Sequence, residues 1–106
     1  MVKIMNEKLK ETYSGYDKSA IERFNNPELN RVILIEECSE VIQALCKIDR
    51  FGIVNHHTGD KNKKDLEEEL GQLQVLIELV ATTNDLDLDN IIEAKNRKLV
   101  KMDRFY

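Results

Sequence analysis

Apolar side chains recur at helical spacing along three stretches of the chain. In the first stretch, which begins at Leu29, they fall three or four residues apart, as they do along one face of an α-helix. Asn26 and Pro27 just before it are typical of a helix start, and Gly52 after it is typical of a helix end. The pattern therefore predicts a helix of about 25 residues that is roughly 37 Å long and ends at Phe51.

Two more helices are predicted after a polar segment. Residues 52–64 are mostly polar and predict a loop. The second helix is expected to end near Thr83, and the third to begin at a cap supplied by Asp87 or Asp89. Their apolar positions, which predict seams facing other helices, are Leu66, Leu70, Leu73, Ile77 and Val80 in the second helix and Leu88, Ile92, Leu99 and Met102 in the third.

These elements predict an all-α fold. Two long antiparallel helices and a C-terminal helix follow an N-terminal section, up to Phe24, that predicts one or two short helices broken at Ser14-Gly15. A length of 106 residues fits one domain, 1–106. The first long helix has adjacent apolar residues, Leu34 and Ile35, so a single buried face would not cover them all. We therefore expect a helical bundle completed by dimerisation, as a homodimer or a dimer of dimers.

Composition and charge argue against several classes of protein. Sixteen basic residues against twenty acidic ones give a net charge of −4, the opposite sign to that of a module that binds duplex nucleic acid. No apolar run reaches about 18 residues, so no membrane span is expected. Cys38 and Cys46 lie about 12 Å apart along a helix, too far for a disulfide. We expect free buried thiols and a cytoplasmic protein.

Carboxylates interrupt the apolar pattern in the middle of the first long helix. Glu37 and Glu40 are three residues apart, which puts their side chains on one face, and Glu36 lies beside them. Burying such like charges is costly, and a hard divalent cation with oxygen ligands would offset the cost. A second acidic cluster, 67–69, stands in the next helix, and Gly71 is expected to allow close approach there. A solvated glutamate-rich surface is the alternative to a metal site.

The acidic motifs and a later basic segment follow a familiar order. Glu36-Glu37-Cys38-Ser39-Glu40 and Glu69-Leu70-Gly71-Gln72 resemble the EExxE…ExxD signature of MazG-like all-α nucleoside triphosphate pyrophosphohydrolases. Residues 35–44 and Arg50-Phe51-Gly52 are most similar to the short, phage-type members. Asn96-Arg97-Lys98-Leu99 resembles the C-terminal Asn-x-Lys segment of that family. The resemblance extends over roughly residues 28–104.

The resemblance implies an enzyme that uses Mg²⁺, with Mn²⁺ as an alternative, to hydrolyse (d)NTPs. Family members cut the bond between the α- and β-phosphates and release nucleoside monophosphate and pyrophosphate. The matching positions imply that Glu37, Glu40 and Glu69 are metal ligands and that Glu36 is the extra acid of the first motif, either a base that orients water or a group just outside the metal ligands. By the same resemblance, the residues on the phosphate side are Lys95, Asn96 and Lys98.

Gln72 departs from the family pattern, because it stands where the second motif has aspartate. An amide oxygen can bind a hard cation but brings no charge, so metal affinity should fall. Glu68, four residues earlier on the same face, is the alternative to Gln72 as the last ligand. The alternative function is a catalytically weakened MazG-like protein that binds nucleotides or a protein partner. A third interpretation is a helical interaction module with solvated glutamates.

Overall fold

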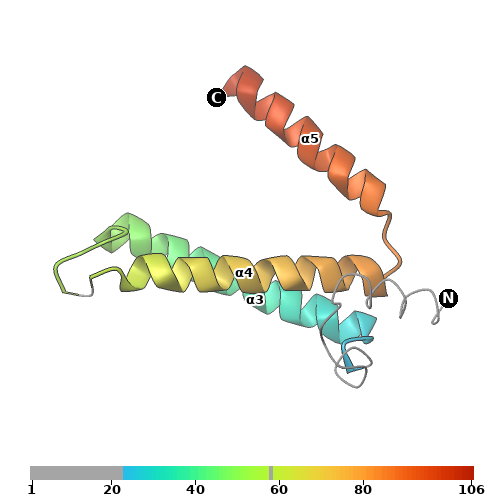
Figure 1. Cartoon of the computed structure of the whole chain (residues 1–106), viewed down its shortest axis with the longest axis horizontal. Coiled ribbons are helices and arrows are strands. Elements are labelled where there is room, and N and C mark those ends of the chain that lie inside the picture. Colours follow the sequence, from blue (N-terminus) through green and yellow to red (C-terminus); the bar gives the residue numbers. More distant parts are fainter. Residues whose placement is uncertain (1–22, 58) are drawn as a thin grey trace.

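The computed structural model describes residues 23–57 and 59–106. Within them the chain forms α3 (Pro27–Phe51), α4 (Lys61–Thr83) and α5 (Leu88–Phe105), and no β-strand. The all-α prediction is confirmed for this part of the chain. Helices α3 and α4 lie side by side and antiparallel, and α5 leads away from the end of α4 (Figure 1). The short helices predicted before Phe24 fall on residues 1–22, outside the described residues.

Both ends of α3 match the sequence prediction. The side-chain oxygen of Asn26 accepts a hydrogen bond of 3.1 Å from the backbone N–H of Leu29, and Pro27 is the first helical residue. At the other end, Gly52 has φ 89° and donates its backbone N–H to the carbonyl of Ile48 at 2.7 Å. A side chain at Gly52 would be strained at this φ, which explains why glycine ends the helix here.

Helix α4 begins earlier than predicted. The loop was expected to reach residue 64, but the first helical residue is Lys61. Two ion pairs at i,i+4 spacing support this polar first turn: Lys61 to Asp65 at 2.6 Å and Lys64 to Asp60 at 3.3 Å. Because the turn holds no apolar residue, apolar spacing gave no signal for it.

Helix α5 begins at the first of the two predicted caps. The carboxylate of Asp87 accepts hydrogen bonds from the backbone N–H groups of Asp89, at 2.9 Å, and Asn90, at 3.3 Å. No residue of α5 is buried. Its predicted apolar stripe, Leu88, Ile92, Leu99 and Met102, is 43–65 % exposed.

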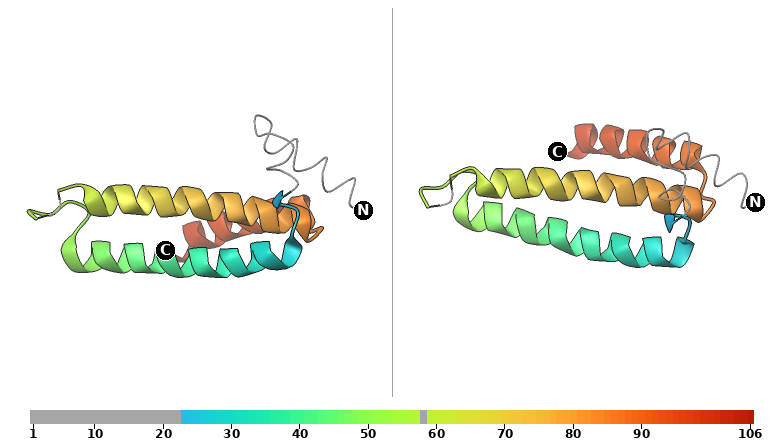
Figure 2. Two further views of the ribbon diagram at one scale, coloured as in Figure 1. Left: turned by 90° about the horizontal axis from the view of Figure 1, so that it is seen from below. Right: turned by 60° about the horizontal axis from the view of Figure 1, so that its bottom comes forward.

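The interface between α3 and α4 follows positions seven residues apart. Seven residues are about two helical turns, so these positions share one face of each helix. The two helices run alongside each other in both views of Figure 2. The buried or half-buried residues with this spacing are Asn30, Glu37 and Ala44 on α3 and Asn62, Glu69, Leu76 and Thr83 on α4.

The seam predicted for the second helix is partly wrong. Leu70 and Ile77 belong to it, but they are 40 % and 42 % exposed. The face toward α3 passes instead through Glu69 and Leu76, one residue earlier in each case. Apolar residues occupy adjacent faces of α4, as at 75–77, so their spacing did not identify the face that packs.

The cysteine prediction is also partly wrong. Cys38 and Cys46 are free thiols, as expected, but both are exposed rather than buried. The buried positions of this part of α3 are Glu37, Val41 and Ala44. The cysteines do not fall on that face, because they are one or two residues away from it and each residue turns the helix by about 100°.

A polar anchor joins the start of α3 to the end of α4. The side-chain amide of Asn30, which is 4 % exposed, donates to the carbonyl of Phe24 at 2.7 Å and to the hydroxyl of Thr83 at 3.2 Å. That hydroxyl donates in turn to the carbonyl of Leu79 at 2.5 Å. These buried bonds fix the register of the helix pair, since a shift would leave polar groups without partners.

We expect Asn30→Ala to lower the free energy of unfolding by about 1–3 kcal/mol, because the buried Thr83 hydroxyl and the part-buried Phe24 carbonyl lose their donor. Urea unfolding followed by circular dichroism measures this. Asn90→Ala is the matched control, since Asn90 is exposed and only its backbone N–H is bonded at the α5 cap. Equal stability of the two variants would contradict a role for Asn30 in fixing the register.

Candidate metal centre

The antiparallel packing of α3 and α4 brings three carboxylates together. Glu37 and Glu40 come from α3 and Glu69 from α4, and one oxygen of each lies within 4.8 Å of the others. Glu37 is 7 % exposed, Glu69 is half-buried and Glu40 is exposed. The sequence predicted these three residues as metal ligands, and the structure places them at one point.

Two oxygens of this cluster are buried without a hydrogen-bond partner among the described residues. They are Oε1 of Glu37 and Oε2 of Glu69. A buried carboxylate oxygen without a donor is costly, and two like charges close together add to that cost. A divalent cation would satisfy both oxygens, since Mg²⁺ and Ca²⁺ bind carboxylate oxygens. The donor set therefore fits a hard metal ion.

The proximity of the carboxylates favours the protonated forms of Glu37 and Glu40 when no ion is bound. The Glu69 carboxylate, which a protonated Glu37 can hydrogen-bond, raises the pKa of Glu37 from 4.5 to about 7, together with burial and the charges of Glu69 and Glu40. The pKa of Glu40 is also raised, again mainly by Glu69. Glu37 and Glu40 therefore each take up a proton more readily in the folded chain than an isolated glutamate does.

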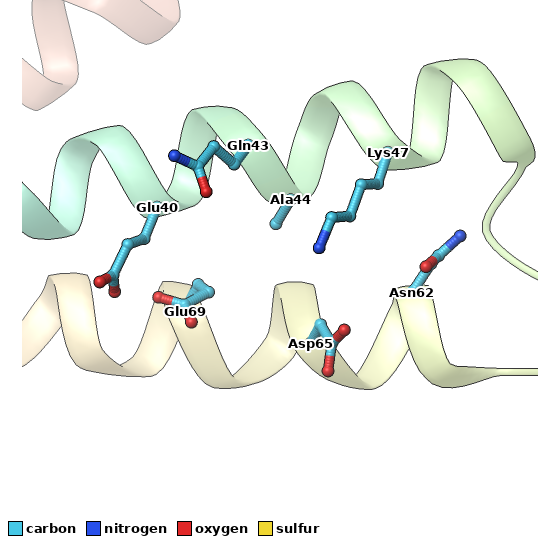
Figure 3. Close-up of a pocket in the computed structure, with 7 residues that line it drawn as sticks. All are labelled: Glu40, Gln43, Ala44, Lys47, Asn62, Asp65 and Glu69. Carbon is cyan, nitrogen blue, oxygen red and sulfur yellow. The ribbon is translucent and has the colours of Figure 1, made fainter. Parts of the chain in front are cut away.

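A hollow of about 350 Å³ opens beside the cluster (Figure 3). Two charged residues that line it, Lys47 and Asp65, lie outside the sequence motifs. Lys47 is two helical turns after Glu40, and Asp65 is one turn before Glu69, so helical spacing from known site residues was the available signal. The remaining lining residues are Glu40, Gln43, Ala44, Asn62 and Glu69.

The other acidic-motif residues lie outside this hollow. Glu36, Glu68 and Gln72 are all exposed, and none of them lines it. The expected role of Gly71 is wrong, because a Cβ built there would meet nothing within 4 Å. Close approach of α3 and α4 at the cluster therefore does not depend on this glycine.

The predicted phosphate-binding residues are on α5, which lines no part of the hollow in the described chain. Lys95 lies instead along a groove between α4 and α5, together with Ile77 and Glu78. Asn96 lines a shallow hollow whose described lining residues all belong to α5. A turn at Asp85, with φ 55°, precedes α5, which then leads away from the helix pair (Figure 1). Lys98 is exposed.

The fold and the site define a class: a helical protein with an acidic centre, suited to a divalent ion, between two antiparallel helices. Residues 25–104 match the family model of the MazG nucleotide pyrophosphohydrolase domain, so the chain belongs to this family of nucleotide pyrophosphohydrolases. No curated protein and no solved structure matches the chain. None of the described helices has the length and hydrophobicity that crossing a membrane requires.

Without metal, the protein is expected to lose stability as the pH rises from about 4.5 to about 7. The folded chain keeps the Glu37 proton up to a pKa of about 7, whereas the unfolded chain releases it near 4.5. Since the folded state binds more protons in this window, raising the pH favours unfolding. Mg²⁺ at pH 8 should reverse the loss. Thermal unfolding from pH 4 to 8, with EDTA or Mg²⁺, measures both effects.

Glu37→Gln tests the origin of this pH dependence. The variant should be more stable than the unchanged protein at pH 8 in EDTA and should respond less to Mg²⁺. Glu67→Gln removes the same charge from an exposed position of α4 outside the cluster and serves as the control. A melting temperature that does not depend on pH in the unchanged protein would disprove the coupling between the carboxylates.

Proposed function

We propose that this protein hydrolyses (d)NTPs at the α–β phosphate bond in a Mg²⁺-dependent reaction, with Mn²⁺ as a substitute ion. The products are a nucleoside monophosphate and pyrophosphate. The observation that carries the proposal is the gathering of Glu37, Glu40 and Glu69, two of them with buried partnerless oxygens, in a chain of the MazG family.

The carboxylates of Glu37, Glu40 and Glu69 hold the ion in this proposal. When bound, Mg²⁺ neutralises phosphate charge and promotes attack of water at phosphorus. The water oxygen bonds to the α-phosphorus, the bond to the β-phosphate oxygen breaks, and pyrophosphate leaves with the bonding pair. Glu36, beside the cluster, orients the water and accepts its proton. Gln72 or Glu68 would supply a further oxygen ligand; both are exposed on α4 near Glu69.

The site is proposed to be shared between two copies of a single domain, 1–106. The exposed apolar stripe of α5 and the exposed Ile35 and Ile42 of α3, at 71 % and 60 %, are large apolar surfaces for one chain. A homodimer, or a dimer of dimers, would cover them. Lys95, Asn96 and Lys98 would then come from the partner copy to the phosphates.

A second candidate function is nucleotide or protein binding without turnover. The observation that favours it is Gln72, because an amide in place of the motif carboxylate weakens metal binding. The sequence segments around Glu37 and Gly52 suggest a relationship to the short, phage-type members of the family. Both functions are compatible with that relationship.

Glu40→Gln is expected to remove most of the hydrolytic activity while the helical fold is kept, because one charged ligand is lost at an exposed position. Gln72→Asp should keep or raise activity, because it adds a charged ligand. The measurement is release of pyrophosphate and monophosphate from a panel of NTPs and dNTPs with Mg²⁺, Mn²⁺ or EDTA.

The same assay separates the two candidate functions. Unchanged turnover in Glu40→Gln would disprove its assignment as a metal ligand. If the unchanged protein releases no pyrophosphate and Gln72→Asp does, Gln72 marks a weakened site and the binding function is favoured.

A shared site predicts complementation between two inactive variants. One is Glu40→Gln, and the other replaces both Lys95 and Lys98 by Ala. Co-expression should restore about a quarter of the original activity, since half of the dimers are mixed and each has one intact site. Failure to restore activity in a purified mixed dimer would show that each copy uses its own α5 or none.

A further inference from the structure

A second hollow continues from the candidate metal centre toward the loop between α3 and α4. Its volume is about 620 Å³, and Lys47 and Asn62 line both hollows. We name it the cationic hollow. Its walls include Lys47, Arg50, Phe51, His56, His57 and Lys61. None of the sequence motifs had assigned a role to this set of residues.

The charge of the cationic hollow is opposite to that of the metal centre. Among the described residues, no aspartate or glutamate lines it. Lys61 is paired at 2.6 Å with Asp65, which lines the first hollow. Lys47 and Arg50 form no ion pair within the described chain. Two unpaired cations on one wall favour an anionic occupant.

The spacing along α3 sets these cations in line with the carboxylates. Lys47 is seven residues after Glu40, or about 10 Å from it along the helix axis. Arg50 follows three residues later, about 15 Å from Glu40 along the same axis. Figure 3 shows the Lys47 side chain pointing from α3 into the space between the helices, on the same side as Glu40 and Glu69. The long, flexible side chain of a lysine can reach across part of this distance toward a group held at the carboxylates.

Arg50 is also held in place by its neighbour. Its guanidinium lies 5.9 Å from the centre of the Phe51 ring, a cation–π contact. The contact occupies one face of the ring, which disfavours stacking of a nucleobase there. A cation–π contact does not use the N–H groups of the guanidinium as hydrogen-bond donors, and phosphate oxygens match these donors well.

We propose that the cationic hollow binds the diphosphate end of the nucleotide and holds it as pyrophosphate after cleavage, with Lys47 and Arg50 as its ligands. The inference rests on the proposed function and gives the substrate a direction: the α-phosphate lies at the carboxylates and the outer phosphates lie toward the loop between α3 and α4. These two cations come from the same chain as the carboxylates, whereas in the proposed dimer Lys95 and Lys98 would come from the partner copy.

Calorimetric titration of the full chain with inorganic pyrophosphate in Mg²⁺ tests the proposal, with nucleoside monophosphate as the second ligand. Lys47→Gln and Arg50→Gln should each weaken pyrophosphate binding at least about tenfold, as expected for loss of one charge-assisted contact. Monophosphate affinity should not change. Lys47→Arg should keep most of the affinity. Lys63→Gln is the matched control, because Lys63 is exposed on the same end of the pair and lines neither hollow.

Three outcomes would overturn the inference. They are no pyrophosphate binding by the unchanged protein, an equal loss of pyrophosphate affinity in Lys63→Gln, or a loss of monophosphate affinity rather than pyrophosphate affinity in the Lys47 and Arg50 variants. The last would show that the nucleoside end occupies the hollow. Circular dichroism verifies that each variant is folded. If the unchanged protein binds pyrophosphate through Lys47 but hydrolyses no nucleotide, the proposed function fails and the cationic hollow stands.

Discussion

Repulsion between carboxylates inside a helix interface is the constraint on which the rest of this structure depends. Glu37 and Glu69 occupy positions where a helical hairpin ordinarily has apolar side chains, and each has a buried oxygen without a partner. Burying like-charged carboxylates at such positions costs stability. The Glu69 carboxylate raises the pKa of Glu37, and in the same geometry the two side chains present ligands to a cation. Stability is thus lower at the point where chemistry is expected.

Polar contacts at the two ends of the hairpin hold the carboxylates in register. Asn30 bonds to Thr83 at one end, and the amide of Asn62 donates to the carbonyl of Gly52 at 3.1 Å at the other. Leu76 and Leu79 are the buried apolar cluster between the first anchor and the acidic centre. Because few apolar side chains are buried among the described residues, the helix pair depends on specific hydrogen bonds to prevent sliding, and a slide of one turn would separate Glu69 from Glu37.

Charge changes sign along the hairpin, and this polarity suits an elongated anionic ligand. Carboxylates occupy the middle, Lys47 stands at the boundary, and Arg50 and two histidines lie toward the loop. Helix α5 takes no part in either hollow, and its apolar stripe is exposed. One chain therefore holds the acidic centre and one group of cations, while the role of α5 depends on what covers its apolar face.

Local sequence determined the helices and the acidic motif, since caps such as Asn26 and Asp87, the stop at Gly52 and the spacing of Glu37 and Glu40 act within a few residues. Apolar spacing could not decide which face of α4 packs, because adjacent faces are both apolar; it favoured Leu70 and Ile77, whereas packing chose Glu69 and Leu76. Only the antiparallel register, set by contacts between residues more than fifty positions apart, placed Glu69 beside Glu37 and Lys47 beside Asn62. The sequence by itself therefore determined the elements and the ligand types, and the tertiary structure decided which of them meet, because burial and hydrogen bonding across the helix pair act between distant residues.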